Sequence, residues 1–440
     1  MITQTRRRLL FASFPILLLI TFTLLQSLQP ANTSFILTVT ASSAPQARFT
    51  YSPPNPHVNG NVTFDASNST SNGGYIVDYR WDFGDGETGN GMIVFHSYNQ
   101  SGVYVVTLNV TDSEGLWCTT SKPVPVLPIL ELTVTTDKPK YYIDLDQIQI
   151  QGNLIFDGYP VPDGLVALEV RNPANQPLVF RTSKTGTAPI SGNTINITEL
   201  FLSDAEGNPR NYAIKGHFIY VSFTVKNIGN ETLSPSIFLN LYQDLYPLSR
   251  ATVGITELSP EESFVVSPIS ISVPDWISVG NATVYVSVLS TYPHSGGYPY
   301  CPEKFLTFPI INPLDPPPSG TPTSGTSPPP TTNGTYNSVF KAPVDAKVEG
   351  FTQGNYTICV SAHHGPEQAT STKTIKVKLA GDANGDGWVD WKDLLLELVP
   401  AYGTTIGDPG WNPSCDFNGD GWIDWRDLLM YLIPFYGKEA

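Results

Sequence analysis

The chain has 440 residues, enough for about three or four domains, and it is acidic, with 39 Asp and Glu residues against 24 Lys and Arg. Residues 380–440 hold 11 acidic and 3 basic residues, so eight of the 15 net negative charges lie in this one segment. Such a balance argues against nucleic-acid binding. Only 14% of residues are charged, while 39 prolines and 36 glycines are present, a composition typical of extracellular β-rich proteins.

Residues 1–44 are predicted to direct export. Three arginines, residues 6–8, precede an uncharged apolar run over residues 9–25. This order is typical of a signal peptide, and the small residues at 41–44 offer a cleavage site. The run is also only slightly shorter than a membrane span. We favour cleavage and release, but the alternative stays open that the protein is tethered to a membrane through residues 9–25.

Two residue patterns fit an exported protein. The four cysteines (118, 301, 359 and 415) form no CxxC pair, which leaves a Cys301–Cys359 disulfide open. Ten Asn-X-Ser/Thr sequences indicate a surface that can be glycosylated. We therefore expect an extracellular or cell-surface protein of a prokaryote, with an archaeal source left open. The ten sequences begin at Asn32, Asn61, Asn68, Asn99, Asn109, Asn196, Asn230, Asn281, Asn333 and Asn355.

Residues 45–127 show short alternating segments separated by turns. Apolar residues recur with period two over 48–51, 61–64 and 103–110. This period is typical of half-buried strands, so the segment is predicted to be a β-sandwich.

The stretch Tyr79–Gly86, with the sequence YRWDFGDG, resembles the motif of a PKD domain, an immunoglobulin-like sandwich. The resemblance implies that Trp81 and Phe83 are core residues and that the tight turn after them begins at Asp82. We interpret Asp82 and Asp85 as turn residues and not as a catalytic pair. The family implies adhesion, spacing or carbohydrate contact.

Residues 128–187 and 335–379 are each too short for a complete sandwich. The first holds about four predicted strands and the second about three, and together they reach the size of an immunoglobulin-like domain. We predict one split sandwich, which resembles a macroglobulin-type or bacterial Ig-like repeat. The alternative is a series of independent modules in which 335–379 is a partial repeat.

Residues 188–312, between the two halves, form a full set of predicted strands. The strand and turn at 224–230, with the sequence TVKNIGN, resemble the CARDB group of extracellular sandwiches. We predict that this domain is inserted into a loop of the split sandwich, which proteins tolerate when the ends of the guest lie close together. Residues 313–334, rich in Pro, Thr and Ser, are predicted to return the chain as an extended, semi-rigid linker.

The last segment, residues 380–440, contains one unit twice, starting at Asp382 and Asp416, with 15 of 22 aligned positions identical. Each unit opens with a loop that has side-chain oxygens at positions 1, 3, 5, 9 and 12, and position 7 adds a backbone carbonyl. Calcium prefers six to eight such oxygens, and Gly387 and Gly421 at position 6 permit the sharp turn. The predicted ligands of two Ca²⁺ ions are Asp382, Asn384, Asp386, Trp388, Asp390 and Asp393 in the first loop, and Asp416, Asn418, Asp420, Trp422, Asp424 and Asp427 in the second.

Position 12 is Asp and not the Glu of the EF-hand pattern, and a helix follows each loop without one preceding it. This combination resembles a type I dockerin, a module that docks onto cohesin domains in the presence of calcium. The near identity of the two units implies that either can dock, in two orientations. The resemblance assigns partner binding to Trp391, Lys392, Leu398, Val399, Trp425, Arg426, Leu432 and Ile433.

The sequence contains no GxSxG, HExxH or phosphate-loop motif, and we predict no catalytic residues. The expected fold is mainly β: several immunoglobulin-like β-sandwiches followed by a small α-helical dockerin-like module with two EF-hand-type calcium loops. The expected function is calcium-dependent docking of a secreted or cell-surface, non-enzymatic protein to a cohesin-like partner. Two alternatives stay open: an accessory protein or hydrolase of polysaccharide degradation that contacts polysaccharide or cell-surface glycans, and a surface-layer protein whose calcium sites only stabilise it.

Overall fold

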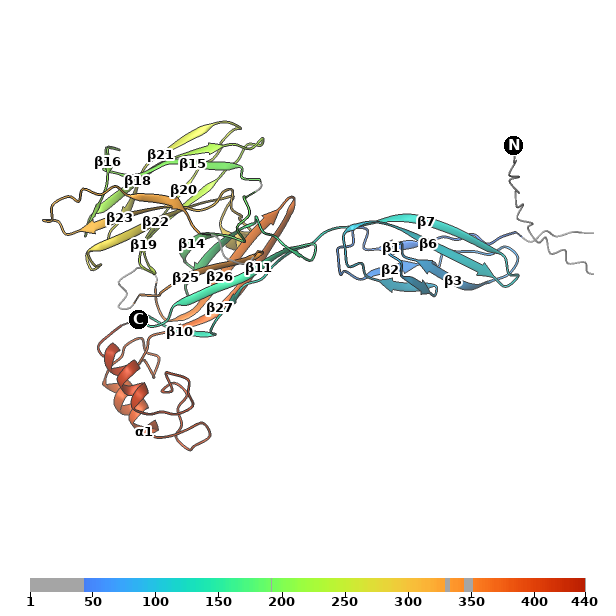
Figure 1. Cartoon of the computed structure of the whole chain (residues 1–440). Helices are drawn as coiled ribbons and strands as arrows, with labels where there is room; N and C mark the ends of the chain where they lie inside the picture. Colours follow the sequence, from blue (N-terminus) through green and yellow to red (C-terminus); the bar gives the residue numbers. More distant parts are fainter. Residues whose placement is uncertain (1–42, 191, 329–332, 344–350, 440) are drawn as a thin grey trace, which may run out of the picture. The chain divides into compact units, whose positions relative to one another are not determined.

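The computed structural model describes residues 43–190, 192–328, 333–343 and 351–439. This part of the chain is mainly β and divides into two compact units, Met1–Pro128 and Ile129–Ala440 (Figure 1). Nearly all of the predicted export segment, with Asn32, lies outside the described residues. Within them, no helix is both long enough and apolar enough to cross a membrane.

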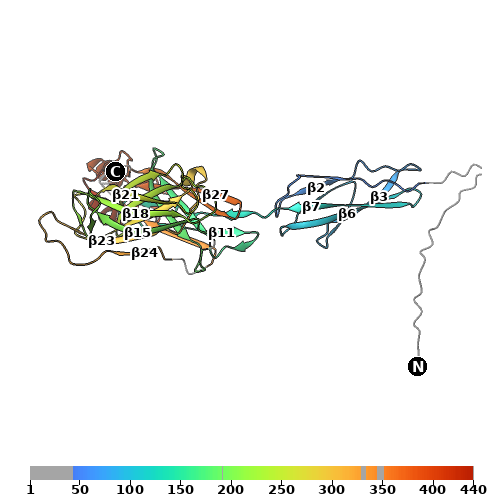
Figure 2. The same cartoon turned by 90° about the horizontal axis from the view of Figure 1, so that it is seen from above.

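The first unit is a sandwich of two antiparallel sheets, with strand orders β1-β2-β5 and β4-β3-β6-β7. Its long strands β6 and β7 run side by side in Figure 2. The strands are β1 (Thr50–Ser52), β2 (Val62–Asp65), β3 (Ile76–Asp82), β4 (Thr88–Asn90), β5 (Ile93–His96), β6 (Gly102–Asp112) and β7 (Trp117–Val126).

Aromatic side chains fill the space between these two sheets. Trp81 and Phe83 are both buried, as the sequence predicted. The Trp81 ring meets Phe49 edge-on at 5.1 Å between centroids, and its indole N–H donates to the carbonyl of Gly91 at 2.8 Å. A buried indole therefore keeps its polar atom satisfied.

The carboxylates after strand β3 organise the turn that leaves it. Asp82 accepts a hydrogen bond from the Gly84 amide at 2.9 Å, and Asp85 accepts one from Glu87 at 3.0 Å. The interpretation of both as turn residues is confirmed. Asp85 also lies 2.7 Å from Nε2 of the buried His96, and these hydrogen bonds lower the pKa of Asp85 although its burial opposes them.

The second unit contains a sandwich built from two separated parts of the chain. Strand β25 pairs with β11 and strand β26 pairs with β13, which is the pairing that a split sandwich requires. The sheet orders are β10-β27-β26-β13-β14 and β12-β11-β25, with β8 and β9 also on β11. The strands are β8 (Leu130–Leu132), β9 (Thr135–Thr136), β10 (Lys140–Tyr142), β11 (Ile148–Phe156), β12 (Tyr159–Pro160), β13 (Leu165–Arg171), β14 (Pro177–Lys184), β25 (Thr335–Phe340), β26 (Gly354–His364) and β27 (Glu367–Lys378).

Between the two halves lies a second sandwich, with its own buried core and the sheets β16-β15-β18-β21 and β17-β23-β22-β19-β20. Its elements are β15 (Ile195–Ser203), β16 (Pro209–Arg210), β17 (Ala213–Ile214), β18 (Phe218–Asn227), β19 (Ser236–Gln243), β20 (Tyr246–Gly254), β21 (Ser263–Ser272), β22 (Gly280–Leu289), the short helix η1 (Pro293–Ser295), β23 (Lys304–Ile311) and β24 (Thr323–Thr326).

The predicted extended, semi-rigid linker 313–334 also pairs with the inserted sandwich, which the sequence did not indicate. Its strand β24 pairs with β23 at the edge of the inserted sheet, and the side chain of Asn211 donates to the carbonyls of Pro318 and Gly320. An edge strand offers unpaired N–H and C=O groups, and a Thr-Ser-Gly-Thr stretch free of proline satisfies them. Four of the linker's residues, 329–332, lie outside the described structure.

A buried polar and aromatic contact joins the two sandwiches of the second unit. The Phe180 ring of β14 stacks on Phe238 of β19 at 4.1 Å between centroids. Next to it, Arg181 donates two charge-assisted hydrogen bonds to the fully buried carboxylate of Glu303, at 3.0 and 2.8 Å. The guanidinium lies 3.6 Å from the ring centre of Tyr285. A paired charge buried this deeply holds host and insert in one arrangement.

All four cysteines are free in the structure, including Cys301 and Cys359, so the disulfide left open by the sequence is not formed. Burial raises the pKa of the Cys301 thiol to about 12 and that of Cys359 to about 11. These thiols therefore remain protonated and unreactive near neutral pH.

The C-terminal segment has one helical stretch after each loop: η2 (Asp393–Leu398) with α1 (Val399–Ala401), and η3 (Asp427–Leu432) with η4 (Ile433–Phe435). The two repeats close on one another through short backbone contacts. Val389 bonds with residues 437 and 438, after the second helix, and Ile423 bonds with residues 403 and 404, after the first. Each loop is therefore fastened by the end of a helical stretch.

We predict that Asp85→Asn lowers the free energy of unfolding of the first unit by about 0.5–1.5 kcal/mol at pH 7, because it removes a hydrogen-bonded carboxylate whose charge is partly screened by solvent. The pKa of Asp85 is lower in the folded state, so its contribution is present above the unfolded value, near 4, and disappears as the pH falls through the folded value. Urea unfolding of residues 43–128 from pH 7 to pH 2.5 measures this. A difference between variant and parent that persists at pH 2.5 would contradict it.

We also predict that Arg181→Met lowers the stability of the second unit by about 3–5 kcal/mol, because Glu303 is left charged and buried without its partner. The matched control is Lys226→Met, which breaks the exposed pair with Glu261 and should cost less than about 1 kcal/mol. Chemical unfolding of both variants makes the comparison. Equal losses would show that the buried pair is not a main contact between the sandwiches.

Candidate metal centre

The two predicted calcium loops, residues 382–393 and 416–427, have nearly the same conformation. Gly387 and Gly421, at the sixth position, have φ angles of 92° and 86°. This left-handed region strains a residue that carries a Cβ atom, so the sharp turn at position 6 depends on glycine. The repeat in the sequence is therefore matched by a repeat in local structure.

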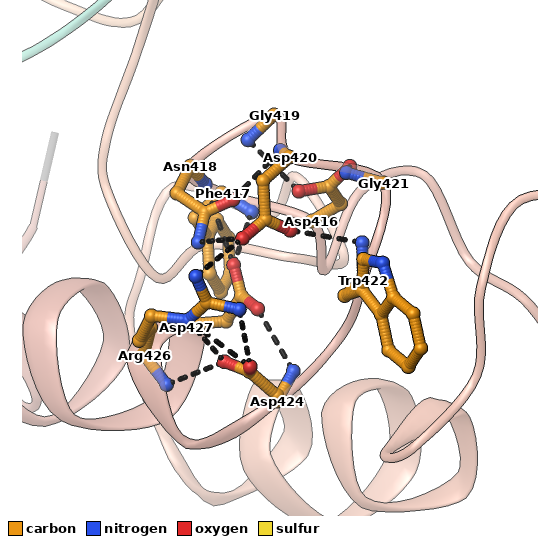
Figure 3. Close-up of polar contacts among 10 residues, drawn as sticks. All are labelled: Asp416, Phe417, Asn418, Gly419, Asp420, Gly421, Trp422, Asp424, Arg426 and Asp427. Atoms are coloured by element: carbon orange, nitrogen blue, oxygen red, sulfur yellow. Dashed lines mark hydrogen bonds and ion pairs between the residues drawn. The ribbon is translucent and has the colours of Figure 1, made fainter.

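The carboxylates at position 12 close the loops. Asp393 accepts hydrogen bonds from the amides of Ala383 at 2.8 Å, Asn384 at 3.1 Å and Asp390 at 2.9 Å. In the second loop, Asp427 accepts from Phe417 at 2.8 Å and Asp424 at 2.9 Å, as Figure 3 shows. Both side chains are 0% exposed. Aspartate at this position thus joins the start, middle and end of each loop.

The carboxylates at position 1 order the glycine-rich turn. Asp382 accepts from the amides of Gly385 at 2.7 Å and Gly387 at 3.0 Å, and Asp416 accepts in the same way from Gly419 and Gly421. Both aspartates are buried. Each carboxylate oxygen has two lone pairs, so these hydrogen bonds leave acceptor capacity for a cation.

The oxygens at positions 3, 5 and 9 make short local turns. In the first loop, Asn384, Asp386 and Asp390 each accept a hydrogen bond from the backbone amide two residues ahead. The second loop repeats this with Asn418, Asp420 and Asp424. These turns bring six of the predicted ligands into compact loops.

Basic side chains compensate part of the negative charge. Lys392 Nζ lies 3.1 Å from Asp386 and 3.5 Å from Asp390, and in Figure 3 the guanidinium of Arg426 reaches both Asp420 and Asp424. Lys392 and Arg426 therefore cover the loops' own carboxylates, in addition to any role in partner binding.

The two buried carboxylates, Asp393 and Asp427, bear on whether each loop could hold a cation. Burial raises the pKa of Asp393 and of Asp427, so their charged forms are disfavoured, and no basic side chain of the described residues forms an ion pair with either. A divalent cation would compensate charges that backbone amides alone only partly stabilise. No three carboxylate, imidazole or thiol groups of the described residues form a ready-made cluster, so the donor set has to include amide and backbone oxygens. Carboxylate, amide and carbonyl oxygens are the donors that calcium prefers, so the chemistry of this set is compatible with that ion.

The predicted docking residues divide into two groups in the structure. Trp391, Val399, Trp425 and Ile433 are exposed. Leu398 and Leu432, in contrast, are 1% and 0% exposed and belong to the core, so their assignment to partner binding is corrected. Leu398 lies five residues after Asp393, and Leu432 lies five residues after Asp427. Both leucines are on the inner side of their helical stretch.

Sequence reasoning missed further apolar residues on the outer side. Exposed large side chains continue along each helical stretch, and they match between the repeats position by position. We call the two sets the first and second apolar stripes. The first consists of Trp391, Leu395, Leu396, Val399 and Tyr402, and the second of Trp425, Leu429, Met430, Ile433 and Tyr436.

The spacing of these exposed residues in the sequence indicates the two apolar stripes. Within a stripe most of them recur three or four positions apart, as residues on one face of a helix do, and one adjacent pair (Leu395–Leu396 or Leu429–Met430) widens that face. The sequence shows a second apolar set on the inner side, so periodicity alone did not distinguish core from surface. An apolar surface of this size on a small module is typical of an interaction site.

Several known proteins resemble this chain in its N-terminal segment. A family model described as "PKD domain" matches residues 42–126. The microbial collagenase of Vibrio alginolyticus is 40% identical over 89 residues, and collagenase ColA of Clostridium perfringens is 44% identical over 66. These matches cover 20% and 15% of the chain. The solved PKD1 domain of the Vibrio cholerae metalloprotease PrtV is 36% identical, covers 19% of this chain and 98% of that domain, and has a TM-score of 0.18.

The chain spans only 11% and 6% of the two collagenases, so the similarity concerns a shared domain and not the whole proteins. The matches are to non-catalytic PKD-like domains. The motif around Trp81, the paired sheets and the family model agree for this segment. The N-terminal unit of this chain is a PKD domain.

Proposed function

We propose that this chain is an exported, non-catalytic docking protein. Its C-terminal segment, residues 380–440, would bind two calcium ions and attach to a cohesin-like domain of another protein. The PKD domain and the two further sandwiches would act as spacer or adhesion modules. The observation that carries the proposal is the matched pair of loops, each followed by a helical stretch with an exposed apolar stripe.

Calcium is proposed from the chemistry of the donors. Each loop offers four carboxylates and one amide oxygen from side chains, with the Trp388 or Trp422 carbonyl as a further candidate. Bound calcium would supply the positive charge that lets buried and clustered carboxylates remain ionised. Asp393 and Asp427 would hold the two ends of each loop together, and the following helical stretch would take its direction from that closure.

Docking is proposed from the two stripes. A tryptophan, three aliphatic or methionine side chains and a tyrosine lie exposed in the same order along both helical stretches. Large aromatic and aliphatic side chains at the centre of an interface contribute most to binding. Since the stripes match, one partner surface would fit either of them.

An extracellular site of action is proposed from independent features. The N-terminal segment has the order of a signal peptide, and the matched relatives share the PKD domain. Of the ten Asn-X-Ser/Thr asparagines, the nine in the described residues are exposed or half-exposed. The buried asparagines 172, 227 and 240 are not in such sequences.

For the calcium sites, we predict that Asp386→Ala combined with Asp420→Ala weakens calcium binding more than about 100-fold, since losing only an outer-shell partner typically costs 10–100-fold. Calorimetric titration of the purified chain measures it. Calcium-dependent stabilisation should disappear, while the unfolding transition of the PKD domain should stay unchanged.

The control for this experiment is Asp408→Asn, which removes one carboxylate charge from the segment between the loops and keeps its turn to Thr405. It should bind two ions like the parent. A parent chain that binds no calcium, or a double variant that binds it equally well, would exclude the proposed sites.

For docking, we predict that Val399→Asp alone and Ile433→Asp alone each weaken binding by only about twofold, the statistical factor for losing one of two equal faces. The double variant should lose binding altogether. Surface plasmon resonance against cohesin-like domains from the same source measures this, and calcium binding by each variant confirms that the module is intact. If one single variant abolishes binding, only that stripe docks.

A further inference from the structure

The C-terminal segment follows the split sandwich without a free linker. Strand β27 ends at Lys378 and the first loop begins at Asp382. The intervening Leu379 and Ala380 are both 0% exposed. Gly381 has a φ of 87°, and a Cβ atom there would lie 2.9 Å from the Cα of Leu432. This connection is packed on both sides and leaves little freedom for the segment to swing.

A side chain from the sandwich contacts the first calcium loop. Gln353, directly before strand β26, donates its amide to Oδ2 of Asp382 at 2.5 Å. The other two hydrogen bonds of this carboxylate come from its own loop. Gln353 therefore holds a predicted ligand from outside the loop.

The second loop lacks such a partner among the described contacts. Within the described part of the chain, the hydrogen bonds that Asp416 accepts come from the amides of Gly419 and Gly421. The two repeats are otherwise closely matched, so this difference between them comes from the sandwich and not from the loops themselves.

The second loop meets the sandwich through an aromatic contact instead. Tyr142, at the end of strand β10, is buried and lies 6.3 Å from Phe417 and 5.7 Å from Tyr431, measured between ring centroids. Phe417 is the second residue of the loop, and its amide donates to Asp427. A core residue of the sandwich thus packs on the side chain of Phe417, the residue whose amide donates to the position-12 carboxylate.

These contacts leave the proposed docking surface free. With the segment packed against the sandwich, the residues of both apolar stripes remain exposed. A partner bound to a stripe would therefore be carried in a fixed orientation relative to the split sandwich.

We infer that the split sandwich is part of the calcium-binding machinery: Gln353 is a positioning residue for the first ion site, and Tyr142 supports the second. This inference rests on the proposed calcium function. Contacts made only to the ordered loops stabilise the form that binds ions, so by linkage they raise calcium affinity, and calcium in turn strengthens the attachment of the segment to the sandwich.

The test is calcium titration of the full chain with Gln353→Leu, by calorimetry. Outer-shell partners of metal ligands typically contribute 10–100-fold in affinity, and we expect a loss of about 10-fold at one of the two sites. The matched control is Gln368→Leu, an exposed glutamine on strand β27 of the same sandwich, which should bind both ions like the parent.

The same measurement in two variants with a single remaining site shows which loop has lost calcium affinity. In Asp420→Ala, where the first loop is the remaining site, Gln353→Leu should weaken calcium binding about 10-fold. In Asp386→Ala, where the second loop remains, it should have no effect. Tyr142→Leu should give the reverse pattern.

The results separate the inference about Gln353 and Tyr142 from the proposal that the chain binds calcium. If Gln353→Leu and Tyr142→Leu leave calcium affinity unchanged in the parent chain and in both single-site backgrounds, the inference is overturned and the calcium proposal stands. If the parent chain itself binds no calcium, both are overturned. Circular dichroism of each variant without calcium checks that the sandwich has remained folded.

Discussion

The C-terminal segment depends on two buried aspartates that close its loops. Asp393 and Asp427 are each fully buried and accept hydrogen bonds from backbone amides at the start and middle of their loops. A buried carboxylate is costly unless it is hydrogen-bonded and its charge is compensated. The loop conformation, the direction of the helical stretch and the exposure of the apolar stripe all follow from this closure. A cation at the loop would stabilise the same arrangement.

The second unit is organised around the split sandwich. On one side its residue Arg181 pairs with the buried Glu303 of the inserted sandwich, and Phe180 stacks on Phe238. On the other side Gln353 contacts Asp382 of the first loop and Tyr142 contacts Phe417 of the second. Both connections use buried or nearly buried side chains, which are more costly to separate than exposed ones. The inserted sandwich and the C-terminal segment are therefore held by one common scaffold.

Local motifs were the part of this protein that could be predicted from sequence. The spacing of Asp, Asn and Gly residues gave the loop turns, because each of those turns depends on a few adjacent residues. The PKD core residues Trp81 and Phe83 followed from a motif in the same way. The exposure of the predicted partner-binding residues could be predicted only in part, since Leu398 and Val399 are adjacent in sequence and yet one is buried and the other exposed. The edge strand β24 and the contact of Gln353 depend on segments far apart in the chain, and no local pattern encodes them.

The most direct test of this account is hydrogen–deuterium exchange of the full chain with calcium and with a chelator. The account predicts that the amides of Ala383 and Phe417, which donate to the position-12 aspartates, exchange slowly with calcium and rapidly without it. Amides in strand β6 of the PKD domain should exchange at the same rate in both conditions. Equal protection of the loop amides with and without calcium would contradict the account, because the loops would then be closed by the protein alone.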